Sequence, residues 1–195
     1  MAAAALGRGE LVVFPTETLY GLGADATAPA AVERLVEVRG RAPGKPILVL
    51  VRDLAMACVV ARTVPPAARR LAARFWPGPL TLVLPARPEL PPALAAGTGT
   101  IGVRVSSHPL AAALVAALGR PVTAPSANPP DAAPPRRLAE ARAYFGDAVA
   151  VWIDGGTLPG GASTVAAVEG ERIRVLRPGV IPAAALEAVL AEEGR

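Results

Sequence analysis

Short apolar runs recur along the whole chain and alternate with longer segments in which apolar residues return every three or four positions. Several of the short runs, such as ILVLV at 47–51 and LTLVL at 80–84, are apolar on both faces. Strands of this kind are usually covered on both sides by other elements. The pattern predicts strands at 11–14, 47–51, 80–84, 101–105, 121–124, 148–153, 163–168 and 173–176.

The longer segments have the periodicity of helices that bury one face. They predict helices at 28–38, 53–62, 65–75, 109–118, 135–145 and 182–193. The clearest signals lie in SSHPLAAALVAALG, where Ser106 or Ser107 can cap a helix that has Pro109 in its first turn and Gly119 at its end. We interpret His108, in the same stretch, as a residue of the helix start rather than a proton carrier.

Length and composition indicate one sizeable core. The chain has 195 residues, of which 52% are hydrophobic but only 4% aromatic, so we expect a core of Val, Leu, Ile and Ala. The alternation of strands and helices predicts a single α/β domain over residues 1–195, with a large, twisted, mixed sheet and flanking helices. The proline-rich piece at 129–135 is predicted to be a loop rather than a linker between domains.

The basic residues are almost all arginine. Lys and Arg number 20 against 16 Asp and Glu, for a net charge of +4, and Lys45 is the only lysine. The planar guanidinium group suits two-pronged recognition of phosphate or carboxylate. A genome that prefers Arg, Ala and Pro explains the same count, so the composition alone does not assign a ligand.

Cysteine usage and hydropathy indicate the cellular compartment of the chain. The single cysteine, Cys58, excludes a disulfide framework and a cysteine-based metal site, and it favours a reducing cytoplasm. The start MAAAALGRGE does not have the pattern of a signal peptide, and the longest apolar run, at 110–118, is about half of a membrane span. We therefore expect a cytoplasmic protein without a membrane partner.

Three glycine-rich segments resemble nucleotide motifs, and none fits. GRAPGKP at 40–46 is one residue short between its glycines for a P-loop, and it has Pro46 where Ser or Thr would hold magnesium. GTGTIG at 97–102 matches a dinucleotide fingerprint, but a predicted strand follows it where a helix is required. GLGADA at 21–26 is a weaker match of the same kind.

Polar residues at strand and helix ends are the remaining candidates for chemistry. The ends of predicted strands in α/β sheets commonly bind ligands, and a charge within a strand needs a partner or a ligand. These candidates are Thr16, Glu17, Thr18, Tyr20, Arg39, Arg41, Lys45, Arg104, Ser126, Asn128 and Ser163. Each has a structural alternative: Arg39 and Arg41 can complement a helix C-terminus, Ser126 and Asn128 can form a turn, and Ser163 can be an ordinary strand residue.

Taken in order and spacing, the motifs resemble the L-threonylcarbamoyladenylate synthase family, with its YrdC-like domain. The resemblance covers about residues 8 to 181 and rests on FPTETLYGLGADA, RGRAPGKPILVLV, FWPGPLTLVLPA, IGVRVSSHPL, TAPSAN and STVAAVEGERIRVLRPG. It implies a concave, positively lined cavity over a mixed sheet. It also implies condensation of L-threonine, bicarbonate and ATP to threonylcarbamoyl-AMP and pyrophosphate, for modification of tRNA.

The same resemblance implies roles for individual residues. The K-x-R motif falls on Arg39 and Arg41 and the S-x-N motif on Ser126 and Asn128, which would grip the nucleotide phosphates and the carbamate. Asn128 is the only asparagine in a chain without glutamine, and its amide supplies a donor and an acceptor at one point. Further expected ligand contacts are Lys45, Ser163 and Arg177 for the nucleotide, and Thr16, Thr18, Tyr20 and Arg104 for the substrate.

Catalysis of this kind is positioning plus electrostatics, without a covalent enzyme intermediate. We expect Mg²⁺ to come with ATP, no protein metal site, and transfer to tRNA through other machinery, with direct RNA binding an open possibility. Two features depart from the family: Arg39 stands in place of Lys, and Pro129-Pro130-Asp131 replaces Leu-Ser-Gly. Two alternatives also remain, a non-catalytic binder of double-stranded RNA or tRNA and a paralogue that adenylates another carbamate.

Overall fold

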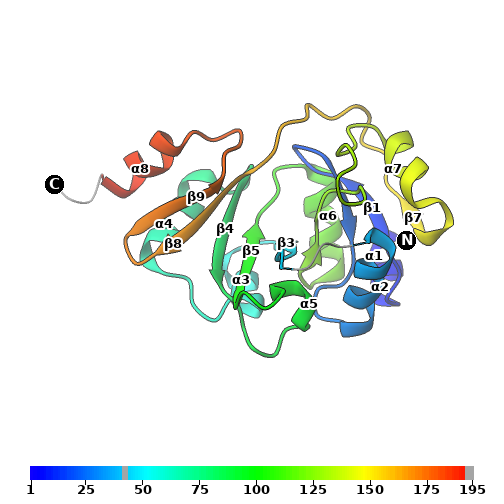
Figure 1. Cartoon of the computed structure of the whole chain (residues 1–195), viewed down its shortest axis with the longest axis horizontal. Coiled ribbons are helices and arrows are strands. Elements are labelled where there is room, and N and C mark those ends of the chain that lie inside the picture. Colours follow the sequence, from blue (N-terminus) through cyan, green and yellow to red (C-terminus); the bar gives the residue numbers. More distant parts are fainter. Residues whose placement is uncertain (41–43, 192–195) are drawn as a thin grey trace.

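The strands of the computed structural model, which describes residues 1–40 and 44–191, form two sheets (Figure 1). One contains β1 (Val12–Pro15), β2 (Tyr20–Gly23) and β7 (Val151–Trp152) in the order β2-β1-β7. The other contains β3 (Leu48–Leu50), β4 (Leu80–Pro85), β5 (Thr100–Arg104), β6 (Val122–Thr123), β8 (Thr164–Glu169) and β9 (Arg172–Arg177) in the order β6-β3-β5-β4-β8-β9. Both sheets combine parallel and antiparallel pairs, which confirms the predicted mixed architecture.

The predicted large sheet is divided, because β2 and β6 are joined by isolated bridges rather than a full ladder. Gly21 is bridged to Ser126 and Asp25 to Val122. Between them the Leu22 amide donates to Pro125 O at 2.9 Å. These contacts hold the β1–β2 hairpin against the segment that carries Ser126 and so bring residues far apart in the sequence to one place.

The helices pack around both sheets (Figure 1). They are α1 (Ala2–Gly7), α2 (Pro29–Arg39), α3 (Leu54–Val60), α4 (Pro66–Phe75), α5 (Pro92–Ala95), α6 (Pro109–Leu118), α7 (Leu138–Phe145) and α8 (Ala183–Ala191). Helix α4 packs against β4 and α8, and α6 packs against α1 and β1. No helix within residues 1–40 and 44–191 is long and apolar enough to cross a membrane.

Differences from the predicted elements have local causes. Helix α6 runs from Pro109 to Leu118 and is followed by Gly119, which is left-handed with φ 70°. Its N-terminal cap is His108, whose Nδ1 accepts from the Leu110 amide at 3.3 Å. The prediction of Ser106 or Ser107 as the cap was wrong, because the Ser106 hydroxyl is bonded to Glu17 instead. The short elements α1, β2 and α5 were not predicted, and α7 begins three residues later than expected, at Leu138.

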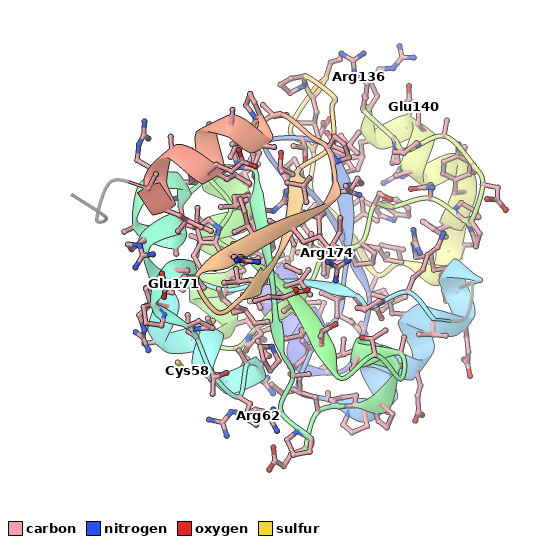
Figure 2. All side chains as sticks on the ribbon, turned by 60° about the vertical axis from the view of Figure 1, so that its left-hand side comes forward. Cys58, Arg62, Arg136, Glu140, Glu171 and Arg174 are labelled. Carbon is pink, nitrogen blue, oxygen red and sulfur yellow. The ribbon has the colours of Figure 1, made fainter. Side chains whose placement is uncertain are left out.

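The core is aliphatic, as the composition predicts. Phe14 and Tyr20 are the aromatic side chains among the largest fully buried ones, and the rest are Leu and Ile. Charged side chains at the surface pair locally, as in Arg174 with Glu169 at 3.0 Å, and Cys58 is an exposed free thiol (Figure 2).

The turn after β9 makes a close approach to the start of β8 at Gly179. A Cβ at Gly179 would lie 2.4 Å from Ala162 O, Ser163 C and Thr164 N, and these are backbone atoms that cannot move aside singly. We expect Gly179→Ala to lower the free energy of unfolding by about 2–3 kcal/mol. Thermal unfolding would show a melting temperature lower by about 5–10 °C. Gly7→Ala is the matched control, since its nearest neighbour is 3.7 Å away; equal melting temperatures for the two variants would contradict the prediction.

Candidate functional site

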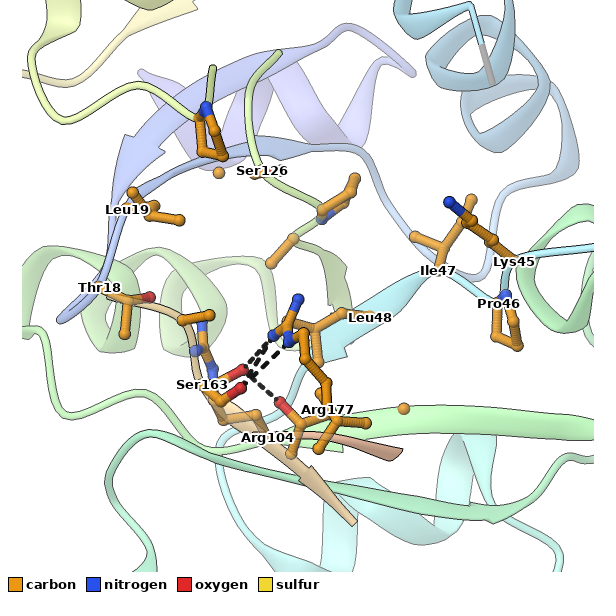
Figure 3. Close-up of a pocket in the computed structure, with 18 of the residues that line it drawn as sticks. Thr18, Leu19, Lys45, Pro46, Ile47, Leu48, Arg104, Ser126, Ser163 and Arg177 are labelled. Carbon is orange, nitrogen blue, oxygen red and sulfur yellow. Dashed lines mark hydrogen bonds between the residues drawn. The ribbon is translucent and has the colours of Figure 1, made fainter. Parts of the chain in front are cut away.

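A cavity of about 600 Å³ lies over one face of the six-stranded sheet (Figure 3). Its size is within the range of about 300–1,000 Å³ typical of ligand sites. The candidate residues predicted from the sequence line it, except Glu17, which lies beside it, and Arg41, which lies outside the described residues. The lining ones are Thr16, Thr18, Tyr20, Arg39, Lys45, Arg104, Ser126, Asn128, Ser163 and Arg177.

The floor of the cavity follows from the alternation of side chains along the strands. In β4, Leu80, Leu82 and Leu84 are fully buried in the core, whereas Thr81 and Val83 line the cavity. In β5 the cavity positions are Thr100, Gly102 and Arg104. One face of the sheet is thus apolar core, and the other presents hydroxyl groups and a cation to a ligand.

Arg177 and Ser163 form a fixed pair at the ends of β9 and β8 (Figure 3). The Arg177 guanidinium donates to Ser163 O at 3.0 Å through Nη2 and at 3.3 Å through Nε, and Nη2 also lies 3.0 Å from Ser163 Oγ. The Ser163 hydroxyl is in turn 3.0 Å from the Thr81 hydroxyl. Burial lowers the pKa of Arg177, but a guanidinium stays protonated, so the pair presents a positive charge whose tethers are neutral.

Arg104 is the most deeply buried cation of the cavity. Its side chain is 3% exposed, and its Nη1 lies 3.4 Å from Oε1 of Glu17. Burial lowers the pKa of Arg104, Glu17 opposes that shift, and repulsion from Arg177 adds to it. Within the described chain, Nε of Arg104 has no hydrogen-bond partner. A buried N–H group without a partner is a ready donor for a bound anion.

Arg39, at the end of α2, and Lys45, in the segment that follows it, bring further positive charge. Arg39 is half-buried, and its Nε donates to Ser126 O at 3.1 Å. Burial lowers the pKa of Arg39. Arg39 lies in the last turn of α2, as its structural alternative requires, and its hydrogen bond links that helix end to a distant segment. Lys45 is exposed at the rim.

Asn128 makes the turn contacts that are one of its two predicted alternatives, and its amide oxygen is left without a partner in the described residues. Its amide nitrogen donates to Pro129 O at 2.8 Å and to Ala132 O at 2.9 Å, which holds the proline-rich loop. Its Oδ1 is buried and has no partner among the residues that the structure describes. The expectation that Asn128 serves the ligand and not the turn was therefore too narrow, since the same side chain organises the loop.

The hydroxyl groups of Thr16, Thr18 and Tyr20 are all hydrogen-bonded within the protein. Thr16 Oγ1 donates to Leu19 O at 2.7 Å and lies 3.0 Å from Thr18 Oγ1, so both threonines are held in place. The Tyr20 hydroxyl donates to Gly156 O at 2.8 Å and accepts from the Gly155 amide at 2.9 Å. Tyr20 lines the cavity while its hydroxyl is hydrogen-bonded within the protein, and its contact with the substrate stays a prediction.

Some lining residues were not predicted as site residues. The polar ones are Thr81, Thr98, Thr100 and Asp131. Thr98 and Thr100 belong to the GTGTIG segment, so the glycine-rich signal marked a cavity wall although it is not a dinucleotide motif. The described part of the chain holds no group of three or more His, Cys, Asp or Glu that could bind a metal ion.

Comparison with known proteins gives consistent matches. A sequence-family profile for Sua5, YciO and YrdC proteins, described as "Telomere recombination", matches residues 4–179. Threonylcarbamoyl-AMP synthase of Bacillus subtilis (strain 168) is 40% identical over 191 residues, which cover 97% of this chain and 55% of the relative. The protein of that name from Pyrococcus abyssi (strain GE5 / Orsay) is 39% identical over 193 residues, covering 98% and 57%. The chain thus spans little more than half the length of these two relatives.

Solved structures agree with this assignment. The crystal structure of P. abyssi Sua5 complexed with L-threonine has a TM-score of 0.91 at 38% identity, covering 98% of this chain and 57% of that one. E. coli YciO has a TM-score of 0.85 at 29% identity, covering 95% and 90%. The resemblance and the α/β fold predicted from the sequence are confirmed. Because the family profile matches nearly all of the sequence, this chain belongs to the Sua5/YciO/YrdC family.

Proposed function

We propose that the protein is an L-threonylcarbamoyladenylate synthase, a nucleotidyltransferase that makes threonylcarbamoyl-AMP and pyrophosphate from L-threonine, bicarbonate and ATP. The single observation that carries the proposal is the convergence of Arg39, Arg104 and Arg177 on one cavity that also holds hydroxyl and amide groups. The names of the B. subtilis and P. abyssi relatives support it. So does the structural match to a protein complexed with L-threonine.

The charge pattern suits the chemistry of the reaction. A carbamate must approach the α-phosphate of ATP, so two anions have to come together while a third, pyrophosphate, leaves. Cations in a partly buried site offset this repulsion more strongly than cations in water. The residues need to bind and orient the reactants, and no side chain has to form a covalent intermediate.

We assign the two groups of cations to different anions. Arg39, Lys45 and, by its motif, Arg41 take the ATP phosphates together with Ser126 and Asn128. The Ser163–Arg177 pair closes the nucleotide site from the sheet, and its fixed geometry matches a phosphate oxygen. Arg104 takes the threonine carboxylate, with Thr16 and Thr18 beside it.

Magnesium enters this scheme as the counterion of ATP. Mg²⁺ in phosphoryl chemistry keeps several waters and is bound by substrate phosphates with one or two carboxylates. Asp131 is the carboxylate that lines the cavity among the described residues, and it can meet such an ion. We further propose that the product serves threonylcarbamoyladenosine formation in tRNA, in the cytoplasm, through separate transfer machinery.

The direct test is pyrophosphate release with one reactant left out at a time. We expect release from ATP to require both L-threonine and bicarbonate, because the nucleophile is the carbamate they form. Release without threonine, or with another amine in its place, would indicate a paralogue with a different substrate. Absence of turnover combined with RNA binding that weakens steeply with salt would indicate the RNA-binding alternative.

Arg39 tests the phosphate side of the site. Because its guanidinium is half-buried in the cavity, Arg39→Ala removes one charge-assisted contact to the nucleotide, and we expect kcat/KM for ATP to fall about tenfold or more. Arg34→Ala is the matched control, since Arg34 is exposed on the same helix. Equal activity of the two variants would remove Arg39 from the nucleotide site.

A substitution at Asn128 tests whether its amide both stabilises the loop and binds ATP. In Asn128→Asp a carboxylate replaces the NH₂ group that bonds to Pro129 O and Ala132 O, so both bonds are lost. We expect the free energy of unfolding to fall by about 1–3 kcal/mol and ATP affinity to fall about tenfold. Thermal unfolding and ATP titration measure the two effects. A change in only one of them would leave Asn128 with a single role.

A further inference from the structure

Glu17 is a partly buried carboxylate next to the cavity, and the proposed function gives it no role. It lies in the turn between β1 and β2, where its neighbours Thr16 and Thr18 line the cavity and Glu17 does not. Its side chain is 13% exposed. Removing a carboxylate from water is unfavourable, so its retention requires compensating contacts.

Those contacts come from β5 and the residues that follow it. Oε1 of Glu17 lies 3.4 Å from Nη1 of Arg104, and Oε2 accepts the hydroxyl hydrogen of Ser106. Ser106 follows Arg104 by two residues, and both side chains approach the Glu17 carboxylate. The His108 amide donates to Ser106 Oγ at 3.2 Å, which leaves the Ser106 hydrogen for Glu17. Oε2 is therefore hydrogen-bonded, whereas Oε1 has the charge of Arg104 beside it but no hydrogen-bond partner among the described residues.

The orientation of Arg104 follows from its two charged neighbours. Glu17 attracts the guanidinium at Nη1, and Arg177 is near enough to repel it. Nε of Arg104 has no hydrogen-bond partner in residues 1–40 and 44–191. With Nη1 turned to Glu17, other N–H groups of the same planar group are left for a ligand in the cavity that Arg104 lines.

We propose that Glu17 is a positioning residue that acts through Arg104, by holding the guanidinium in the orientation that binds the carboxylate of the amino-acid substrate. The identity of that anion rests on the proposed function, whereas the positioning does not. Glu17 offsets the charge of Arg104, so the two side chains together carry no net charge, which suits one carboxylate better than a polyphosphate.

The kinetic test is Glu17→Gln, which keeps the shape of the side chain and removes its charge. We expect KM for L-threonine to rise about tenfold or more, since the guanidinium is no longer held, with kcat and KM for ATP changed less than about threefold. Glu10→Gln is the matched control, because it removes a surface carboxylate paired with Arg8 at 2.8 Å. An unchanged KM for L-threonine in Glu17→Gln would overturn the proposal.

A double-mutant cycle separates positioning from plain stabilisation. If Glu17 acts through Arg104, then adding Glu17→Gln to Arg104→Met raises KM for L-threonine no further. Additive effects would overturn the proposal. Should Glu17→Gln fail to fold, Ser106→Ala removes one partner of the carboxylate without a change in charge; it should raise KM for L-threonine about threefold, and no rise would count against the proposal.

A crystal structure of Glu17→Gln decides the positioning without reference to the reaction. We expect the Arg104 guanidinium to leave the orientation that it has in a wild-type crystal structure. An unmoved Arg104 would overturn the proposal even if the enzyme is a synthase. Conversely, wild-type protein without threonine-dependent pyrophosphate release would refute the proposed function, and the position of Arg104 would still decide the role of Glu17.

Discussion

The site depends on holding several positive charges close together on one face of a sheet whose other face is apolar core. The guanidinium groups of Arg39 and Arg177 repel other cations, so each needs a tether within the protein. Both are tethered by neutral backbone carbonyls, those of Ser126 and Ser163. A neutral tether fixes the geometry of a cation without cancelling its charge. The charge of Arg39 and Arg177 is therefore left for a ligand, and an anion can bind these two without breaking an ion pair, unlike Arg104, which is paired with Glu17.

The fold supplies this arrangement through the alternation of its strands. The leucines of β4 bury one face of the sheet against helix α4 and its neighbours, which fixes the strand positions to within the tolerance of a packed core. The opposite face then holds Thr81 and Arg104 in fixed positions along the cavity. The bridges between β2 and the segment that carries Ser126 close the cavity from the other side. Packing on one face thus determines chemistry on the other.

The sequence predicted most of the fold and most of the polar residues that line the cavity, for two different reasons. Long periodic segments such as α6 carry their own start and stop signals, so local physics determines them. The cavity was predicted from the ordered motifs. The features that the sequence did not predict depend on tertiary contacts. The glycine-rich Tyr20–Gly23 strand forms by pairing with β1. The helix caps and the hydrogen bonds of the arginines depend on which side chain is nearest in space.

Arg39 shows how a departure from a family pattern can be accommodated. The resemblance places lysine at this position, and an ammonium has one nitrogen, which would have to divide its hydrogen bonds between Ser126 O and the ligand. A guanidinium separates the two tasks, because Nε bonds to Ser126 O while the Nη groups lie further along the side chain. The same side chain can then fix the segment that carries Ser126 and Asn128 and contact a phosphate. The arginine therefore keeps the charge and adds a structural link to the loop, which is itself altered to Pro129-Pro130-Asp131 in this chain.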